Sequence, residues 1–404
     1  MSQICRPATD GDEVSRRGAL KKITASSSLL LAAPSQLLPG PRANNKVRMG
    51  VVGGGFGASF HWHEHPDSEV VAVAELRQDR RSRLQRQNPK AEAYVDFKDL
   101  VKDKRVDAVA VFTGVPEHAW MAEYAMKRGK HVVCAVPAAI TLEECRRLID
   151  TVKSTGMTYM NAETSYYYPS VMTCRRWKRE GKFGEIFYSE GEYNHDIEDL
   201  RKESKWFYFK GKPTWRLGLP PMFYITHSSA GVISVTGERL TEVACLGWGH
   251  DHDALRENRY RDNSFSNSVA LFKTSGGHSS RITEFRHCAP AGMVRNAFYG
   301  TRMSFFDKMG NGEATVSTPP HEMTDWEIED HQDLLPPELR KSSGHRGSHT
   351  HLTHEFVSSV AEQRWPAINV YEAVAFCAPG IVAHESAREA GGWKKIPDFG
   401  RAPG

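Results

Sequence analysis

The sequence predicts an α/β protein in two parts: a doubly wound parallel sheet, then an α+β part with a large, mostly antiparallel open sheet. In the first part, short apolar segments alternate with helix-length segments up to residue 162, which is typical of a parallel sheet. From residue 186 onward, alternating strands joined by turns predict the second sheet. We expect an N-terminal segment over 1–41, the first domain over 42–165 and the second over 166–404.

The composition excludes several classes of protein. Of 404 residues, 40% are hydrophobic and 25% charged, and the mean hydropathy is −0.52. These values exclude a multi-span membrane protein, a collagen-like repeat and a wholly disordered chain. Lys and Arg number 53 against 49 Asp and Glu, a net charge of +4 that offers no electrostatic footprint for nucleic acid. A small-molecule partner is therefore expected, and seven scattered cysteines without a Cys-x-x-Cys pair predict no disulfide framework.

The N-terminal segment is similar to an export signal. Ser15-Arg16-Arg17-Gly18-Ala19-Leu20-Lys21 precedes an apolar stretch over 23–33, and Pro34, Pro39 and Pro41 follow. This stretch is too short to span a bilayer but suits a twin-arginine signal, which predicts a periplasmic or extracellular protein and no stable membrane span. The alternative is a disordered basic N-terminus of a cytosolic protein.

The first domain is predicted from five apolar strands and two helices. The strands cover 47–52, 70–74, 107–113, 131–136 and 158–162, and the helices cover 116–128 and 143–155. The first strand runs into Gly53-Gly54-Gly55-Phe56-Gly57-Ala58, which satisfies Gly-x-Gly-x-x-Gly/Ala. Such glycines make a tight turn and let backbone N–H groups approach a pyrophosphate at the N-terminus of the next helix.

An acidic residue at the end of the second strand supports a dinucleotide site. Glu75 lies 22 residues after Gly53, where this fold places the carboxylate that binds the adenosine ribose. A carboxylate repels a 2′-phosphate, so Glu75 favours NAD. Arg77 and Arg80 could accommodate that phosphate, so NADP stays open, and both arginines could equally be solvated charges.

Several further motifs resemble the Gfo/Idh/MocA family of sugar oxidoreductases. They are the glycine loop, Pro116-Glu117-His118, Gly129-Lys130-His131-Val132-Val133 and Pro137 at a strand end. The resemblance implies a Rossmann domain that binds NAD and a second domain that binds a sugar. The residues expected at the cofactor are Gly53, Gly55, Phe56, Gly57, Glu75, Arg77, Thr113, Pro116, His118, Val136 and Pro137.

The chain departs from that family at Val136. The family usually has Glu-Lys-Pro here, with a lysine that moves the proton of the substrate hydroxyl, whereas this chain has Ala135-Val136-Pro137. The stretch from Val136 to Cys145 resembles the NAD-dependent α-N-acetylgalactosaminidases of the same fold. The likeness continues at 183–185, 193–196, 215–216 and 224–227, while Ser228-Ser229-Ala230 replaces their usual Gly-Leu-Gly.

The second domain is predicted from strands over 186–193, 242–248, 268–274 and 278–287. Ser275-Gly276-Gly277 joins the last two as a hairpin, and helices are expected over 170–179, 350–361 and 371–389. An open sheet needs one face covered, and in this family it usually makes homodimers or homotetramers.

Four residues are the candidate catalytic groups. Tyr193 and His195 are two apart at a strand end and so share a face, where they suit sugar binding and proton transfer. Tyr224 and His227 match the glycosidase pattern, in which the histidine lies over the nicotinamide and contacts sugar hydroxyls. For each pair the alternative is a structural role.

Substrate-binding residues are expected at Trp215, Arg216, His345 and His349, with core packing as the alternative for the tryptophan and arginine. No metal site is predicted. His250-Asp251-His252-Asp253 is a polar loop whose neighbouring side chains seldom converge on one ion, and His351 and His354 lack an evident third ligand.

Three functions remain open at this point. The first is an exported NAD-dependent enzyme that transfers hydride from a sugar or glycoside. In a redox-neutral glycosidase, His227 or Tyr193 would remove the proton made acidic by the ketone, the anomeric group would leave, and water and hydride would return. The second is a net sugar dehydrogenase with a proton acceptor other than lysine. The third is a non-catalytic nucleotide or sugar sensor.

Overall fold

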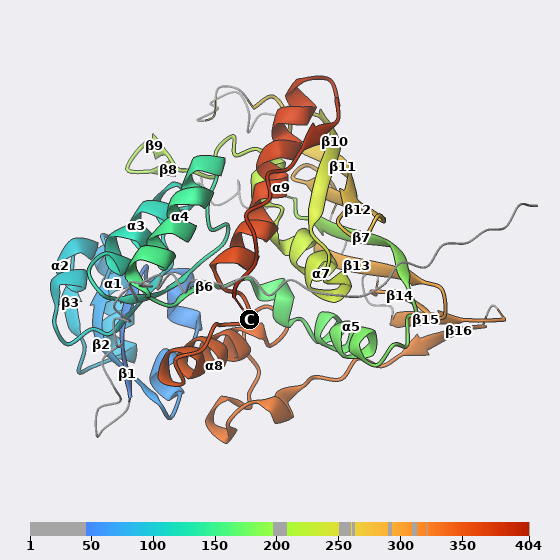
Figure 1. The fold of residues 1–404 in the computed structure, drawn as a ribbon. Helices are drawn as coiled ribbons and strands as arrows, with labels where there is room; N and C mark the ends of the chain where they lie inside the picture. Colours follow the sequence, from blue (N-terminus) through green and yellow to red (C-terminus); the bar gives the residue numbers. More distant parts are fainter. Residues whose placement is uncertain are drawn as a thin grey trace, which may run out of the picture. The chain divides into compact units, whose positions relative to one another are not determined.

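Two sheets organise the chain (Figure 1). The computed structural model describes residues 46–196, 208–249, 260, 263–289, 293–308, 313–320 and 322–403. The predicted signal around Arg16-Arg17 and the loop His250-Asp251-His252-Asp253 lie outside these residues. Within the described ranges no helix has the length and apolar character needed to cross a membrane. The six described cysteines are free thiols.

The first sheet has six parallel strands in the order β3-β2-β1-β4-β5-β6, so the predicted doubly wound sheet is confirmed. Its strands are β1 (Val47–Val52), β2 (Ser68–Ala74), β3 (Glu92–Tyr94), β4 (Ala108–Val111), β5 (His131–Cys134) and β6 (Tyr159–Asn161). β4 and β6 are buried throughout, which explains their continuous apolar sequence. β3 was not predicted because it is short and partly exposed at the sheet edge.

One face of this sheet is covered by α2, α3, α4 and α9, whose apolar side chains form a buried cluster with it. The helices of this half are α1 (Gln78–Gln87), α2 (Phe97–Lys102), α3 (His118–Met126) and α4 (Leu142–Thr155), with the short 3-10 helix η3 (Val115–Glu117) before α3. The sequence sets the bounds of α4 locally. A capping box between Thr141 and Glu144 begins the helix, and Gly156 in the left-handed region ends it.

The connection from β1 to β2 differs from the expected helix after the glycine loop. It consists of two 3-10 helices, η1 (Phe56–Ser59) and η2 (Trp62–Glu64), which are too short to cover a strand. Instead α8 (Ser348–Ala361) packs on this face, where Leu352, Phe356 and Val357 join the buried cluster that contains Val51. The Trp62 and Phe356 rings meet edge to face at 6.0 Å. A helix near the C-terminus thus completes the N-terminal sheet.

The second sheet has nine strands in the order β16-β15-β14-β13-β7-β12-β11-β10-β17. Only β7 and β12 pair in parallel, so the predicted mostly antiparallel sheet is confirmed. Its strands are β7 (Ile186–Asn194), β10 (Leu240–Trp248), β11 (Asn267–Thr274), β12 (Ser279–Phe285), β13 (Met293–Gly300), β14 (Ser304–Phe306), β15 (Ala314–Thr318), β16 (Glu322–Trp326) and β17 (Lys394–Lys395). β8 (Tyr208–Phe209) and β9 (Lys212–Pro213) form a separate ribbon.

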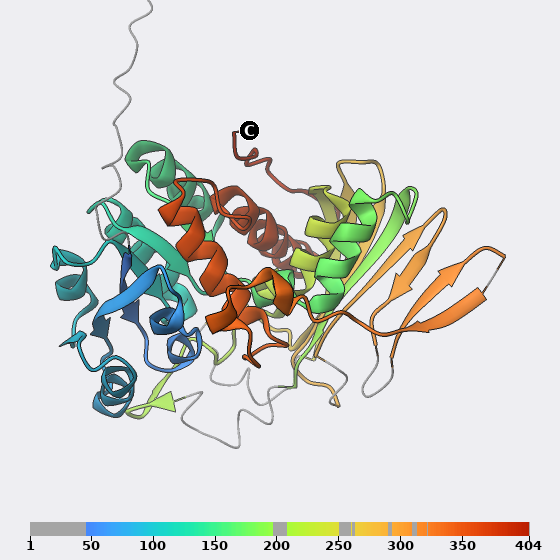
Figure 2. The same ribbon diagram turned by 90° about the horizontal axis from the view of Figure 1, so that it is seen from below.

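Helices lie along one face of the nine-stranded sheet (Figure 2). α7 (Thr226–Thr236) packs on β7 and β13, and α5 (Pro169–Arg179) packs on α7. α9 (Val370–Arg388) contacts β10 on one side and α4 on the other, and therefore joins the two sheets. The chain before α9 extends the edge of β6, where the Asn161 N–H donates to the Ile368 carbonyl at 3.0 Å. The remaining 3-10 helices are η4 (Thr164–Tyr167), η6 (Pro221–Tyr224), η8 (Gln332–Leu334) and η9 (Pro337–Leu339).

Candidate functional site

The glycine loop and the end of β2 are held together by one carboxylate. Gly53 has φ of +100°, and a Cβ there would lie 2.1 Å from the Phe112 carbonyl oxygen, so only glycine fits. Glu75 accepts hydrogen bonds from the Gly54 N–H at 2.8 Å and the Arg77 N–H at 3.0 Å. Each carboxylate oxygen retains a lone pair for a further donor, as ribose binding requires.

The space over Gly55 is open on the side that a diphosphate would need. A Cβ at Gly55 would meet only the guanidinium of Arg80, with Nη1 at 3.3 Å. Arg77 instead pairs with Asp79 at 2.9 Å, while no described carboxylate pairs with the Arg80 side chain. Because η1 is too short to provide a helix dipole, the guanidinium of Arg80, which a Cβ at Gly55 would meet, is a positive charge placed to face a diphosphate here. The sequence indicated both arginines as possible phosphate ligands but gave no reason to prefer one of them.

The other expected cofactor residues lie at the same edge, at the ends of β4 and β5. His118 is buried, with Nδ1 2.8 Å from the Pro137 carbonyl oxygen and Nε2 3.2 Å from that of Thr113. Burial lowers the pKa of His118, against the influence of these two carbonyls. The structure thus places His118 as a bridge between the two strand ends. Val136 is also buried, and Pro116 begins the turn of η3.

Three of the four candidate catalytic side chains form one aromatic cluster, and the fourth is bonded to it. The His227 ring meets Tyr193 edge to face at 4.8 Å and Tyr224 at 5.3 Å. The Tyr193 hydroxyl lies 2.8 Å from Nδ1 of His195. Burial raises the pKa of the Tyr193 phenol, and the guanidinium of Arg286, 4.5 Å from the ring centroid, opposes that rise. The cluster therefore places an imidazole beside a phenol whose raised pKa keeps it protonated near neutral pH, so that the phenol can donate a hydrogen bond or a proton.

Two buried carboxylates support this cluster, and sequence reasoning missed both. Glu163 Oε1 accepts a hydrogen bond from His227 Nδ1 at 2.7 Å. Glu284 bonds to the Ser228 hydroxyl and pairs with Arg286 at 2.8 Å, and burial raises the pKa of Glu284 to about 8 although Arg286 and Ser228 oppose it. The position of Glu163 directly after a predicted strand was an available signal. The position of Glu284 inside a strand gave no such signal.

The expected substrate residues connect the cluster to the nucleotide half. The Trp215 ring stacks with Tyr224 at 6.1 Å and lies against Gly114, where a Cβ would be 2.7 Å from the indole. Arg216 lies 4.4 Å from the Trp215 ring centroid. These contacts bring both residues to the edge that holds the ends of β4 and β5.

His345 and His349 approach the same place from the start of α8. His345 Nδ1 lies 2.9 Å from His349 Nε2, and both rings meet Phe56 of the glycine loop edge to face. His349 Nδ1 also lies 3.0 Å from the Ser59 carbonyl oxygen, so its imidazole braces η1. Burial, with the nearby His227, lowers the pKa of His345 to about 4. His345 is therefore neutral at ordinary pH.

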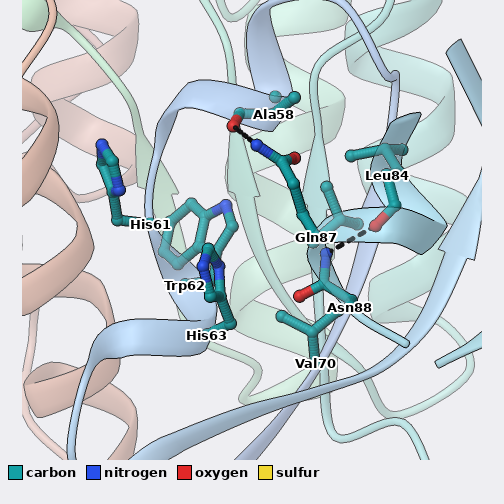
Figure 3. A pocket seen from close by; sticks show the side chains of 10 residues that line it. Ala58, His61, Trp62, His63, Val70, Leu84, Gln87 and Asn88 are labelled. Carbon is teal, nitrogen blue, oxygen red and sulfur yellow. Dashed lines mark hydrogen bonds between the residues drawn. The ribbon is translucent and has the colours of Figure 1, made fainter. Parts of the chain in front are cut away.

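No group of His, Cys, Asp or Glu in the described part of the chain is arranged to hold a metal ion. His354 lies 3.0 Å from His65, and His351 stacks on Tyr167 at 5.7 Å. A separate pocket lies below η1 and η2, between them and α1 (Figure 3). Of the predicted site residues only Gly57 lines it, and Gln87 crosses it to donate to the Ala58 carbonyl at 3.2 Å.

Fold and glycine loop together define a dinucleotide-binding protein of the Rossmann class. Residues 47–163 match the Gfo/Idh/MocA model, described as an oxidoreductase family with an NAD-binding Rossmann fold. Residues 336–403 match the C-terminal domain of glycosyl hydrolase 109. Both matches confirm the resemblance to Gfo/Idh/MocA oxidoreductases and to their glycosidase branch.

Individual relatives agree with these matches. A glycosyl hydrolase family 109 protein of Solibacter usitatus is 27% identical, over 89% of this chain and 90% of its own. One of Bacteroides thetaiotaomicron is 34% identical over 42% of this chain and 38% of its own. Among solved structures, an oxidoreductase domain protein from Kribbella flavida gives a TM-score of 0.72 at 18% identity, covering 87% of this chain and all of its own. Levoglucosan dehydrogenase in complex with NADH gives a TM-score of 0.70 at 17% identity, covering 88% of this chain and all of its own. The solved structures support the fold.

Gly55 provides a direct test of the cofactor site. We expect Gly55→Val to fold normally, because its Cβ meets only a flexible guanidinium, and to lose on the order of a hundredfold in NAD affinity, because the side chain fills the diphosphate cradle. Isothermal titration with NAD measures the affinity and thermal unfolding measures the fold. Gly392→Val is the control, because this glycine is exposed and a Cβ there would make only an ordinary contact with the Glu389 carbonyl oxygen at 3.7 Å. Unchanged affinity in Gly55→Val would place the cofactor elsewhere.

Arg80→Gln tests the charge at the same cradle. Removing one guanidinium from a diphosphate is expected to reduce NAD affinity roughly tenfold at low salt, and less as salt screens the contact. Arg77→Gln is the matched comparison because Arg77 is already paired with Asp79. A larger loss in Arg77→Gln than in Arg80→Gln would contradict the assignment.

Proposed function

We propose that this chain is an NAD-dependent glycosidase that works without net redox change on a glycoside. The observation that carries the proposal is Val136. It is buried at the end of β5, where the related oxidoreductases have a lysine that moves the proton of a hydroxyl. Valine cannot move a proton, so the proton transfers fall to the His227–Tyr193 cluster. The similarity to glycosyl hydrolase family 109 proteins supports the same class.

Each part of the site then has a task. When bound, NAD supplies the hydride acceptor and donor that no side chain can supply. Trp215 offers an aromatic face to a sugar ring, and Arg216 offers hydrogen-bond donors to its hydroxyls. His227 takes the proton from the carbon next to the oxidised position, and Tyr193, in contact with His195, protonates or deprotonates the oxygen groups. Val136 is buried, and Trp215 and Tyr224 are half-buried and stacked on one another, so these side chains restrict water near the reacting carbon.

A net sugar dehydrogenase is the second candidate. Levoglucosan dehydrogenase and myo-inositol 2-dehydrogenase share the fold, with TM-scores of 0.70 and 0.68. In that case the same imidazole or phenol would accept the hydroxyl proton in place of lysine. The two reactions differ in whether NADH accumulates.

The proton-transfer assignment predicts a large loss of rate in two variants. His227→Ala and Tyr193→Phe should each reduce kcat by roughly 10²–10⁴-fold, because a positioned acid or base contributes that much. The assay uses p-nitrophenyl glycosides, beginning with the α-N-acetylgalactosaminide. Thermal unfolding and NAD titration verify that both variants fold and bind cofactor. Full activity in both would show that the site is misplaced.

The redox-neutral route predicts isotope exchange without net reduction. In heavy water the product should carry deuterium at C2, because the C2–H bond breaks during elimination, and absorbance of NADH should not rise. Mass spectrometry and NMR of the product, with absorbance recorded in parallel, make the measurement. One NADH per substrate consumed, with no deuterium at C2, would establish the dehydrogenase instead.

We also propose export by the twin-arginine route, supported by Arg16-Arg17 and the apolar stretch after it. That route carries folded proteins, which suits an enzyme with a bound cofactor, and a redox-neutral reaction needs no external pool of NAD. Changing the pair to Lys-Lys should leave the folded protein in the cytoplasm. Cell fractionation and immunoblotting measure this, and normal export of the variant would contradict the proposal.

The open face of the nine-stranded sheet supports a homodimer or homotetramer. Leu246 and Leu271 lie on adjacent strands with 58% and 50% of their surfaces exposed, and Trp248 is close by on β10. Apolar side chains on one sheet face favour contact with a second copy. We expect Leu271→Glu to convert the wild-type oligomer to monomer in analytical ultracentrifugation, with Lys153→Glu, at an exposed position on α4, as the control. A wild-type monomer would refute the proposal.

A further inference from the structure

Glu163 and His227 form the most completely buried acid–imidazole pair beside the candidate catalytic cluster. Glu163 is fully buried, and His227 is nearly so. Oε1 of Glu163 also accepts from the backbone N–H of Ser165 at 2.8 Å and its hydroxyl at 2.9 Å. These bonds hold the carboxylate in place before it meets the imidazole. They arise because Glu163 caps η4, directly after β6.

The Glu163 member of the pair is an ionised carboxylate. Burial alone would raise the pKa of the Glu163 carboxyl, but the charge and hydrogen bond of His227, together with the Ser165 N–H, hold that pKa below its usual value. An ionised carboxylate only accepts hydrogen bonds. At 2.7 Å the proton between the two groups therefore belongs to Nδ1 of His227.

A proton on Nδ1 decides what the other ring nitrogen can do. In a neutral imidazole one nitrogen carries the proton and the other carries the lone pair, so Nε2 is the basic atom here. Without a partner at Nδ1 the ring would exchange between its two tautomers and spend part of its time with Nε2 blocked. The sequence identified His227 as a candidate base but gave no reason for its ring to adopt the Nδ1–H tautomer, in which Nε2 can accept a proton.

We propose that Glu163 is a positioning residue: it holds His227 in the Nδ1–H form, so that Nε2 accepts the substrate proton, and its charge stabilises the resulting imidazolium. The inference rests on the proposed function of His227. The C–H electron pair stays on the substrate, the proton moves to Nε2, and the Nδ1 proton remains shared with Glu163. Glu163 itself need not touch the substrate.

Several other polar and charged groups lie near His227 and could also influence its tautomer. They come from β7, η6, β12 and the segment before α8. They are Tyr193, Tyr224, Glu284 through Ser228, Arg286 through the two tyrosine rings, and His345. Within the described part of the chain, Glu163 is the only carboxylate hydrogen-bonded to the imidazole itself. Its removal should therefore change the tautomer more than removal of any other group.

A measurement of the tautomer tests the proposal without an activity assay. Protein labelled with ¹⁵N at histidine, with His227 assigned by comparison with His227→Gln, reports on which nitrogen carries the proton. We expect Nδ1–H in the wild type and in Glu163→Gln, whose amide oxygen still accepts, and a mixture rich in Nε2–H in Glu163→Ala. A wild-type ring with its proton on Nε2, or the same tautomer in Glu163→Ala, would overturn the proposal.

Kinetics separate the charge of Glu163 from its geometry. Glu163→Ala should lower kcat by up to roughly 10²–10⁴-fold with little change in KM, because the base is lost and sugar contacts are not. In Glu163→Gln the amide keeps the hydrogen bond to the ring but not the negative charge, so the dependence of kcat/KM on pH should differ from that of the wild type. Glu123→Gln, at a buried carboxylate on α3 that pairs with Arg147 at 3.0 Å, is the control for burial alone.

The outcomes distinguish this inference from the proposed function. If His227→Ala is inactive while Glu163→Gln keeps the wild-type pH profile, the role of Glu163 is wrong and that of His227 stands. If His227→Ala is fully active, the proposed function fails, and the tautomer measurement still decides whether Glu163 orients the ring. Thermal unfolding of each variant, compared with Glu123→Gln, shows whether a loss reflects the fold alone.

Discussion

The packing of α8 on β1 is the constraint on which the rest of the structure depends. A parallel sheet must be covered on both faces, and the two 3-10 turns after the glycine loop cannot cover β1. Phe356 and Val357 of α8 supply that cover, and the Thr353 hydroxyl donates to the Phe60 carbonyl in the turn. The glycine loop is therefore braced by a helix from the far end of the sequence rather than by its own crossover helix.

This packing also assembles the site. His349 lies in the first turn of α8 and His345 lies just before the helix, so the segment that completes the sheet brings two imidazoles against Phe56. On the other side, Trp215 lies on the backbone of Gly114 and stacks with Tyr224, which borders His227. The glycine loop and the cluster of Tyr193, Tyr224 and His227 thus lie near one another because segments from both halves meet at one sheet edge. Neither half contains the site alone.

The sequence predicted the regular elements well and the supporting contacts poorly. The strands β1 and β7 follow from the pattern of apolar residues, and α4 follows from its apolar face and capping residues; all of these are local signals. Tyr193 and His227 were identified from motifs shared with a known family. The short crossover was missed because Gly-x-Gly-x-x-Gly/Ala does not encode the length of the helix that usually follows it. The bond between Glu163 and His227 joins residues 64 positions apart, and no periodicity reports such a contact.

The dependence of the first sheet on α8 has a consequence for how the chain is made. β1 leaves the ribosome roughly 300 residues before α8, an interval on the order of 15–60 s at usual rates of synthesis. During that time the apolar face of β1, with Phe60, Trp62 and Leu84 of α1 beside it, lacks the cover that α8 provides. The first sheet therefore gains its full native packing only after α8, in the last seventh of the chain, has been synthesised.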